Sequence, residues 1–181
     1  MDEIQKEKSE GLSWEYLGEA MKEKAELSGR YITPMPALMG QMFAVLAKTV
    51  IDEVGLEQGE AIIKKAVEDF GQTRGKRIAE KVKARGLALS FKNFLVHMDL
   101  DTSAANTSVP NIDGKDLTLT INRCFIRDGA CDLGLEPYFH YYCQWIDQAI
   151  LFGYNPDLTI EITKFLSGGD DACFFRYIVS K

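Results

Sequence analysis

The sequence lacks several features that mark common classes of protein. No uninterrupted apolar run reaches the ~18–20 residues that a membrane-spanning helix requires. None of the four cysteines is paired with another at the C-x-x-C spacing of structural zinc sites. The charged N-terminus, MDEIQKEKSEG, has no apolar segment typical of a secretory signal. We therefore expect a cytoplasmic protein with reduced thiols, no membrane association and no bound metal.

Sequence motifs of the widespread enzyme classes are also missing. The chain contains no G-x-S-x-G motif, no phosphate-binding loop and no dinucleotide-binding glycine pattern. Its net charge of −6 argues against a nucleic-acid partner, which usually requires a basic face. No cofactor is predicted. The basic stretch TRGKRIAEKVKAR alternates with apolar residues at helical spacing, which is typical of the solvated side of a helix.

What is present is a pattern of helices followed mainly by strands. Residues 1–34 form a polar N-terminal segment, and residues 35–181 read as a single α+β domain. Helical periodicity predicts helices over 37–54 and 56–85, and Ser90 is placed to cap a shorter third helix. Gly71 and Gly75 interrupt the second helical pattern, which leaves a kink, a break or a close backbone approach open.

The last third of the chain alternates between strand and helix patterns. Residues 117–126 alternate as a strand, residues 158–166 and 173–180 predict two further strands, and an edge strand is expected near residues 107–109. A helix is expected over 136–151, after a turn that contains Cys131. The predicted fold is α+β, with N-terminal helices packed on a small antiparallel sheet and one helix inserted between the C-terminal strands.

The helix over 136–151 carries the residues best suited to chemistry. At 100° per residue, Glu136, His140, Cys143 and Asp147 fall on one stripe. A thiol flanked by an imidazole and a carboxylate has the groups needed for nucleophilic or general-base catalysis. The same groups could bind a divalent metal, or they could simply be polar residues beside a core face. The sequence alone leaves these three interpretations open.

Other reactive or charged residues are less informative. Arg30 and Arg74 are candidate anion anchors, but nothing in their local sequence distinguishes them from surface residues. Strand alternation puts Cys173 on the same face as Phe175 and Tyr177, so it should point into the core. We therefore expect Cys173 to support a site rather than to attack a substrate.

The C-terminal third carries a set of motifs, namely a strand cysteine, a helix with Cys and Asp four apart, an Asn-Pro before a strand, and a final hairpin: Cys124, Cys143, Asp147, Asn155, Pro156, Gly169, Asp170, Cys173 and Phe175. Together these motifs resemble the pattern of the L-2-amino-thiazoline-4-carboxylic acid hydrolase family. The resemblance covers roughly residues 35–179, and its specific motifs lie in the last third. The chain departs from the family pattern in two places. Phe174 follows the last cysteine, where the family usually has an acidic residue, and the strand before it reads Ile162-Thr163-Lys164, where the family favours an Arg and Thr pair. Lys164 is a candidate substitute for that arginine.

The resemblance implies a hydrolase that opens the C–N bond of a cyclic amidine such as 2-amino-thiazoline-4-carboxylate. On that basis Cys143 is the predicted nucleophile and Asp147 the acid/base or orienting carboxylate. The residues predicted to surround the substrate are Cys124, Glu136, His140, Lys164, Gly169, Asp170 and Cys173. Backbone N–H groups of residues 168–170 are expected to donate to substrate oxygens, because glycine allows close approach.

A second interpretation belongs to a different class of protein. The same hairpin is distantly similar to small-molecule-binding domains of the 4-vinyl reductase type, some of which act only as ligand sensors. The aromatic residues of the helix, from Tyr138 to Trp145, suit the wall of a ligand pocket. In either case the expected partner is a small molecule, and a homodimer is compatible with the sequence.

Overall fold

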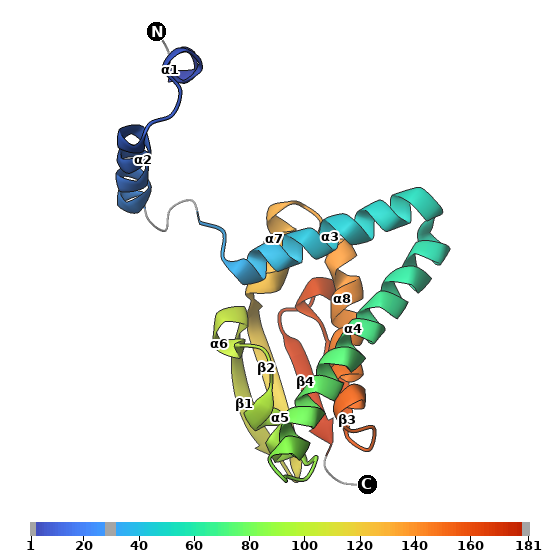
Figure 1. The fold of residues 1–181 in the computed structure, drawn as a ribbon. Helices are drawn as coiled ribbons and strands as arrows, with labels where there is room; N and C mark the ends of the chain where they lie inside the picture. Colours follow the sequence, from blue (N-terminus) through green and yellow to red (C-terminus); the bar gives the residue numbers. More distant parts are fainter. Residues whose placement is uncertain (1–2, 28–31, 179–181) are drawn as a thin grey trace. The chain divides into compact units, whose positions relative to one another are not determined.

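The computed structural model describes residues 3–27 and 32–178, and the chain divides into two compact units between Thr33 and Pro34. The first unit holds α1 (Glu3–Glu10) and α2 (Trp14–Glu26), and neither helix contains a buried residue (Figure 1). Ser13 caps α2 by accepting a hydrogen bond from the backbone N–H of Tyr16 at 3.1 Å. Tyr16 also donates its hydroxyl hydrogen to Glu7 of α1.

The second unit begins with four helices: α3 (Met35–Val54), α4 (Leu56–Ala84), α5 (Phe91–His97) and α6 (Thr102–Ala105). Gly55, with φ of 83°, ends α3 and lets the chain turn directly into α4. Ser90 caps α5 as predicted, accepting a hydrogen bond from the backbone N–H of Asn93 at 3.3 Å. The long helices α3 and α4 are the part of this unit that projects beyond the sheet (Figure 1).

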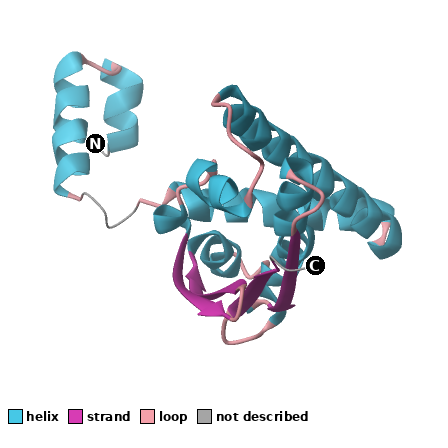
Figure 2. Ribbon diagram, turned by 90° about the horizontal axis from the view of Figure 1, so that it is seen from below, coloured by secondary structure: helices cyan, strands magenta, loops and turns pink. Residues whose placement is uncertain are grey.

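Four strands form one antiparallel sheet in the order β1-β2-β4-β3. They are β1 (Asn106–Asp113), β2 (Asp116–Cys124), β3 (Thr159–Lys164) and β4 (Cys173–Ile178). The register pairs Leu119 with Phe175, so the apolar residues of β2 and β4 share one face. The helices of the second unit gather on one side of the sheet (Figure 2). The predicted α+β fold is thus confirmed.

Two helices, α7 (Phe125–Asp132) and α8 (Glu136–Tyr154), lie between β2 and β3 in the chain. The expectation of a turn around Cys131 was wrong, because this residue belongs to α7. Gly129 explains the error: in sequence it signals a loop, whereas in the structure it allows α7 to touch α3. A Cβ added at Gly129 would lie only 2.0 Å from the carbonyl oxygen of Ala37.

The close contact between α4 and α8 organises the core of the second unit. A Cβ added at Gly75 would lie 2.1 Å from the carbonyl oxygen of Ile150, and one added at Gly71 would lie 2.6 Å from the Cβ of Ala149. The two glycines therefore mark a close approach rather than a kink or a break, and α4 is continuous. Within the described residues, no helix combines the length and apolar character needed to cross a membrane.

Candidate functional site

A cavity of about 130 Å³ lies between α4, α8 and the sheet. Its walls are mostly apolar, and a few polar or ionisable side chains point into it, which is the usual composition of a small-molecule site. The chemically active members of the wall are Arg74 from α4, Cys143 and Asp147 from α8, Cys124 from the end of β2 and Cys173 from the start of β4. Four chain segments that are distant in sequence thus contribute to one site.

Asp147 is the carboxylate of this cavity. Burial raises the pKa of Asp147 from 3.8 to about 6, and the positive charge of Arg74 acts in the opposite direction. A carboxylate with this pKa can exchange protons near neutral pH, which suits a general acid or base.

Arg74 is the cation of the cavity and is held in place from outside it. Its Nε donates to Oδ2 of Asp99 at 3.0 Å, and an Nη donates to Oδ1 at 2.6 Å. These hydrogen bonds hold the pKa of Asp99 below its ordinary value. The guanidinium also lies 5.5 Å from the centre of the Phe70 ring. Arg74 is therefore fixed in orientation, and its remaining N–H groups are free of Asp99.

Cys143 lies one helical turn before Asp147 on the same face of α8. Burial raises the pKa of its thiol well above the ordinary value, while a hydrogen bond with the Ser167 side chain acts in the opposite direction. Ser167 in turn shares a 2.9 Å hydrogen bond with Nδ1 of His140. The thiol is thus protonated at neutral pH and needs a base if it is to act as a nucleophile.

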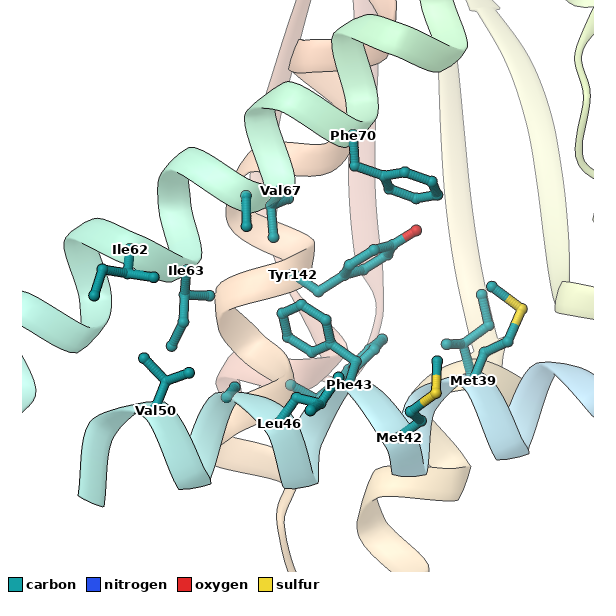
Figure 3. A pocket seen from close by; sticks show the side chains of 14 residues that line it. Met39, Met42, Phe43, Leu46, Val50, Ile62, Ile63, Val67, Phe70 and Tyr142 are labelled. Carbon is teal, nitrogen blue, oxygen red and sulfur yellow. The ribbon is translucent and has the colours of Figure 1, made fainter. Parts of the chain in front are cut away.

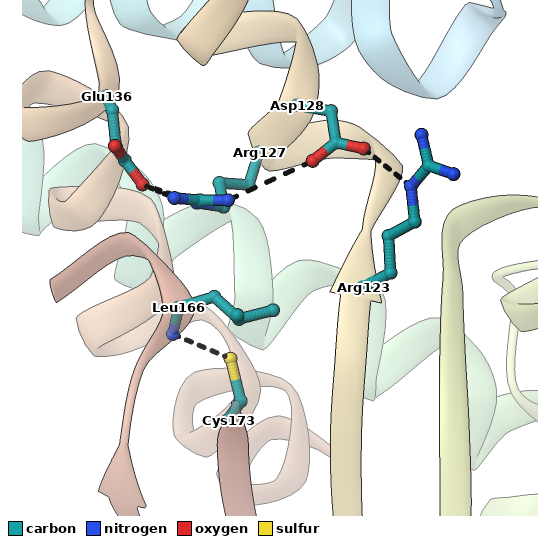
Figure 4. A network of polar contacts seen from close by, with 6 residues as sticks. All are labelled: Arg123, Arg127, Asp128, Glu136, Leu166 and Cys173. Atoms are coloured by element: carbon teal, nitrogen blue, oxygen red, sulfur yellow. Dashed lines mark hydrogen bonds and ion pairs between the residues drawn. The ribbon is translucent and has the colours of Figure 1, made fainter. Parts of the chain in front are cut away.

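The other two cysteines of the cavity come from the sheet. Cys173 is 7% exposed, and its Sγ accepts a hydrogen bond from the backbone N–H of Leu166 at 3.2 Å (Figure 4). Burial raises the pKa of both Cys124 and Cys173. For Cys124 the backbone N–H groups of Arg127 and Ile126, at the start of α7, act in the opposite direction. Both thiols are therefore neutral wall groups.

Several residues predicted to surround the substrate lie outside this cavity. Glu136 forms an ion pair with Arg127 (Figure 4), and Lys164 lies 3.6 Å from Asp171 on the surface. His140 contacts Ser167 and Gln144 rather than the cavity. The hairpin residues Gly169 and Asp170 are exposed, and the Asp170 carboxylate accepts a hydrogen bond from the backbone N–H of Phe165 at 2.8 Å. Of the predicted stripe on α8, Cys143 and Asp147 line the cavity, whereas Glu136 and His140 do not.

Arg74 was the residue that sequence reasoning could not single out. It lies on α4, far in sequence from the motifs of the last third, and it reaches the cavity because the glycines of α4 bring the helix against α8. The sequence did hold a weak signal for this residue. An arginine continues an apolar stripe at helical spacing, which runs through Ile63, Val67, Phe70 and Arg74.

The remaining candidates give no sign of a preformed metal site. In the regions that the structure describes, no group of three or more His, Cys, Asp or Glu side chains is arranged to hold a metal ion. Arg30, the other candidate anion anchor, falls outside the described residues.

A second hollow, of about 330 Å³, lies between α3 and α4 (Figure 3). We call this hollow the α3–α4 groove. It shares three wall residues with the polar cavity, namely Ile126, Phe139 and Tyr142. The two spaces are therefore neighbours.

The fold and the cavity define an α+β protein in which two closely packed helices and a four-stranded sheet enclose a small thiol- and carboxylate-lined space. The chain belongs to the L-2-amino-thiazoline-4-carboxylic acid hydrolase family, whose sequence profile matches residues 35–177. The resemblance seen in the sequence is thereby confirmed.

Among solved structures, the chain is similar to a trafficking protein particle complex subunit 3 from Naegleria fowleri covalently bound to palmitic acid. The identity is 14%, the TM-score is 0.50, and the match covers 81% of this chain and 95% of the other. At this identity the likeness concerns the fold alone. No curated protein matches the sequence significantly.

Proposed function

We propose that this protein is a hydrolase that opens the C–N bond of a small cyclic amidine bearing a carboxylate, such as 2-amino-thiazoline-4-carboxylate. Membership of the family supports the reaction class. The observation that carries the assignment of residues is that Cys143, Asp147 and Arg74 line one cavity. At about 130 Å³ that cavity is smaller than the ~300–1,000 Å³ of typical drug-sized pockets, which suits a single-ring substrate.

In this proposal the substrate carboxylate pairs with the free N–H groups of Arg74. The amidine carbon then lies between the Cys143 thiol and the Asp147 carboxylate. Asp147 takes the thiol proton as the sulfur attacks the amidine carbon, and it passes that proton to the ring nitrogen as the C–N bond breaks. Water then attacks the same carbon and expels the Cys143 sulfur, which recovers a proton through Asp147. The product is S-carbamoyl-cysteine, and one water molecule is consumed.

The raised pKa values support this division of roles. A thiol whose pKa lies well above its ordinary value stays protonated until a base is at hand, and a carboxylate with a pKa of about 6 is ionised at neutral pH. Cys124 and Cys173 complete the wall in this proposal. In this proposal the Ser167 hydroxyl, which interacts with the Cys143 thiol and shares a hydrogen bond with Nδ1 of His140, orients the nucleophile.

The test is to incubate purified protein with 2-amino-thiazoline-4-carboxylate and to follow S-carbamoyl-cysteine by mass spectrometry. We expect turnover by the wild type and by Cys131→Ala, whose thiol lies outside the cavity. Cys143→Ser and Asp147→Asn should each lose at least ~100-fold in kcat/KM, as expected for a nucleophile and its base. Absence of turnover on any cyclic amidine, with and without added divalent metals, would exclude the proposal.

A second candidate is a non-catalytic small-molecule-binding domain. The similar subunit 3 structure, which carries covalently bound palmitic acid, shows that a protein of this fold can hold an organic ligand. In that case Cys143→Ala and Asp147→Asn would change ligand binding or stability, and no variant would show turnover. Native mass spectrometry of freshly purified protein separates the two candidates, since a sensor should retain its ligand.

A further inference from the structure

The α3–α4 groove is an apolar feature of the second unit that the proposed reaction does not use. Fourteen residues line it, and the hydroxyl of Tyr142 is the one polar side-chain atom among them (Figure 3). Several wall residues are well exposed, including Met42 at 63%, Leu46 at 58% and Phe70 at 48%. Contiguous apolar surface of this kind usually marks a binding site.

The groove leads towards the polar cavity along one face of α4. Ile63, Val67 and Phe70 line the groove, and Arg74, one turn further on, lines the cavity. Ile63 and Arg74 are eleven residues apart, which corresponds to about 16 Å at the α-helical rise. This face of the helix therefore changes from apolar to cationic over the length of an extended alkyl chain.

Phe70 and Tyr142 form the junction between the two spaces. Their side chains point toward one another across the gap between α4 and α8 (Figure 3). Phe70 contacts the Arg74 guanidinium with its ring, and Tyr142 belongs to both walls. An occupant of the groove that reaches past Phe70 therefore meets Arg74, whose N–H groups not taken by Asp99 can donate hydrogen bonds to a carboxylate.

We propose that the α3–α4 groove binds the alkyl tail of an amphipathic carboxylate whose head group pairs with Arg74. The binding itself requires neither Cys143 nor Asp147, but it shares Arg74 with the proposed ring-opening reaction, so an alkyl carboxylate and the thiazoline substrate would compete for this arginine. Arg74 provides a positive charge at one end, and the rest of the groove wall is apolar. This combination favours a long-chain monocarboxylate over a polar metabolite. The flexible side chains of Met39 and Met42 can adapt to the tail.

The first experiment measures binding of a homologous series of alkyl carboxylates, from hexanoate to dodecanoate, by isothermal titration calorimetry below their micellar concentrations. We expect dodecanoate to bind and the affinity to rise up to about fourfold per methylene group, the ratio that corresponds to transfer of one CH₂ from water. Dodecanol and dodecyltrimethylammonium should bind at least ~10-fold more weakly than dodecanoate, because Arg74 selects an anion. Affinity that is independent of chain length, or a preference for the cationic head group, would overturn the proposal.

The second experiment uses a matched pair of variants on α3. Leu46→Asp places a charge in the groove wall, whereas Val45→Asp places the same charge on the neighbouring residue, which is 45% exposed and lies outside the wall. We expect Leu46→Asp to weaken dodecanoate binding at least ~10-fold and Val45→Asp to change it less than ~2-fold. Equal effects of the two substitutions would contradict the proposed site. So would a wild-type dimer that Leu46→Asp converts to monomers without any alkyl ligand being bound, because the groove would then be an interface between copies.

Discussion

Gly75 of α4 and Ile150 of α8 lie so close together that a Cβ on the glycine would come within 2.1 Å of the isoleucine carbonyl oxygen. This contact is adjacent to the site, because Arg74 immediately precedes Gly75 and Ile150 itself lines the cavity. The distance between Arg74 on α4 and Asp147 on α8 thus depends on Gly75, where the structure has no room for a side chain.

Gly75→Ala should therefore force α4 away from α8. We expect a loss of about 1–3 kcal/mol in the free energy of unfolding, typical of overpacking, measured by urea denaturation monitored by circular dichroism. Gly18→Ala is the control, since its helix offers open space around the added methyl group. That substitution should be neutral or slightly stabilising through helix propensity. A Gly75→Ala protein as stable as the wild type would contradict the close approach.

Asp147→Asn should make the protein more stable at high pH. The pKa of Asp147 in the folded protein, about 6, is above its ordinary value of 3.8, so the folded state favours the protonated form. Ionisation therefore costs stability, and that cost is absent below about pH 4 and grows as the pH rises through 4 to 6. Removing the charge should raise the unfolding free energy by roughly 1–3 kcal/mol at pH 8 and by much less at pH 4.

Thermal denaturation of wild type and Asp147→Asn at the two pH values measures this difference. Glu53→Gln, an exposed carboxylate on α3, is the control and should show no pH-dependent gain. If Asp147→Asn is less stable than the wild type at pH 8, the buried carboxylate contributes favourable contacts rather than a cost.

Activity on a cyclic amidine should fall as the pH is lowered through about 6. Below that value Asp147 is protonated and can no longer take the proton of the Cys143 thiol. We expect log kcat/KM to decline with a slope of about one on the acid side. The decline should persist in His140→Gln, because the neighbouring imidazole is the other group whose titration could cause it. A profile that stays flat to pH 4.5 would remove Asp147 as the base.

Arg74→Gln should weaken binding of the substrate carboxylate more than it slows the chemical step. Loss of a charge-assisted hydrogen bond corresponds to roughly a ten- to hundredfold rise in KM, with a smaller change in kcat. Arg77→Gln removes an exposed arginine from the same helix and should leave both constants within ~2-fold. Steady-state kinetics on the two variants distinguish an anion anchor from a structural arginine: an unchanged KM with reduced kcat would contradict the anchoring role.

The sequence predicted most of the elements, but it missed α7 and could not predict the contacts between elements. The Ser90 cap, the alternation of Leu117, Leu119 and Ile121, and the long period of α8 are local patterns, and each predicted its element correctly. Gly129 looked like a loop residue in the sequence. The contact that requires a glycine there is with the backbone of α3, which is far away in the chain.

The same physical limit applies to the candidate site. Cys143 and Asp147 share a helix face, so their proximity follows from helical geometry alone. Arg74 comes close to them only through tertiary packing. Glu136 belongs to the same helical stripe, but it forms an ion pair with Arg127 of α7 and does not line the cavity. Long-range partners of this kind carry no signal in local periodicity, and the roles assigned to these residues stay predictions.

The glycine contacts between α4 and α8 have a consequence for how relatives of this protein can diverge. Side chains added at Gly71 and Gly75 meet backbone atoms of α8, whereas Met39, Met42 and Leu46 of α3 are exposed. Selection can therefore alter what the outer wall accommodates by single point mutations, while the spacing of the charged groups stays constant. We expect sequence variation among homologues to concentrate at Met39, Met42 and Leu46 and to spare Gly71 and Gly75.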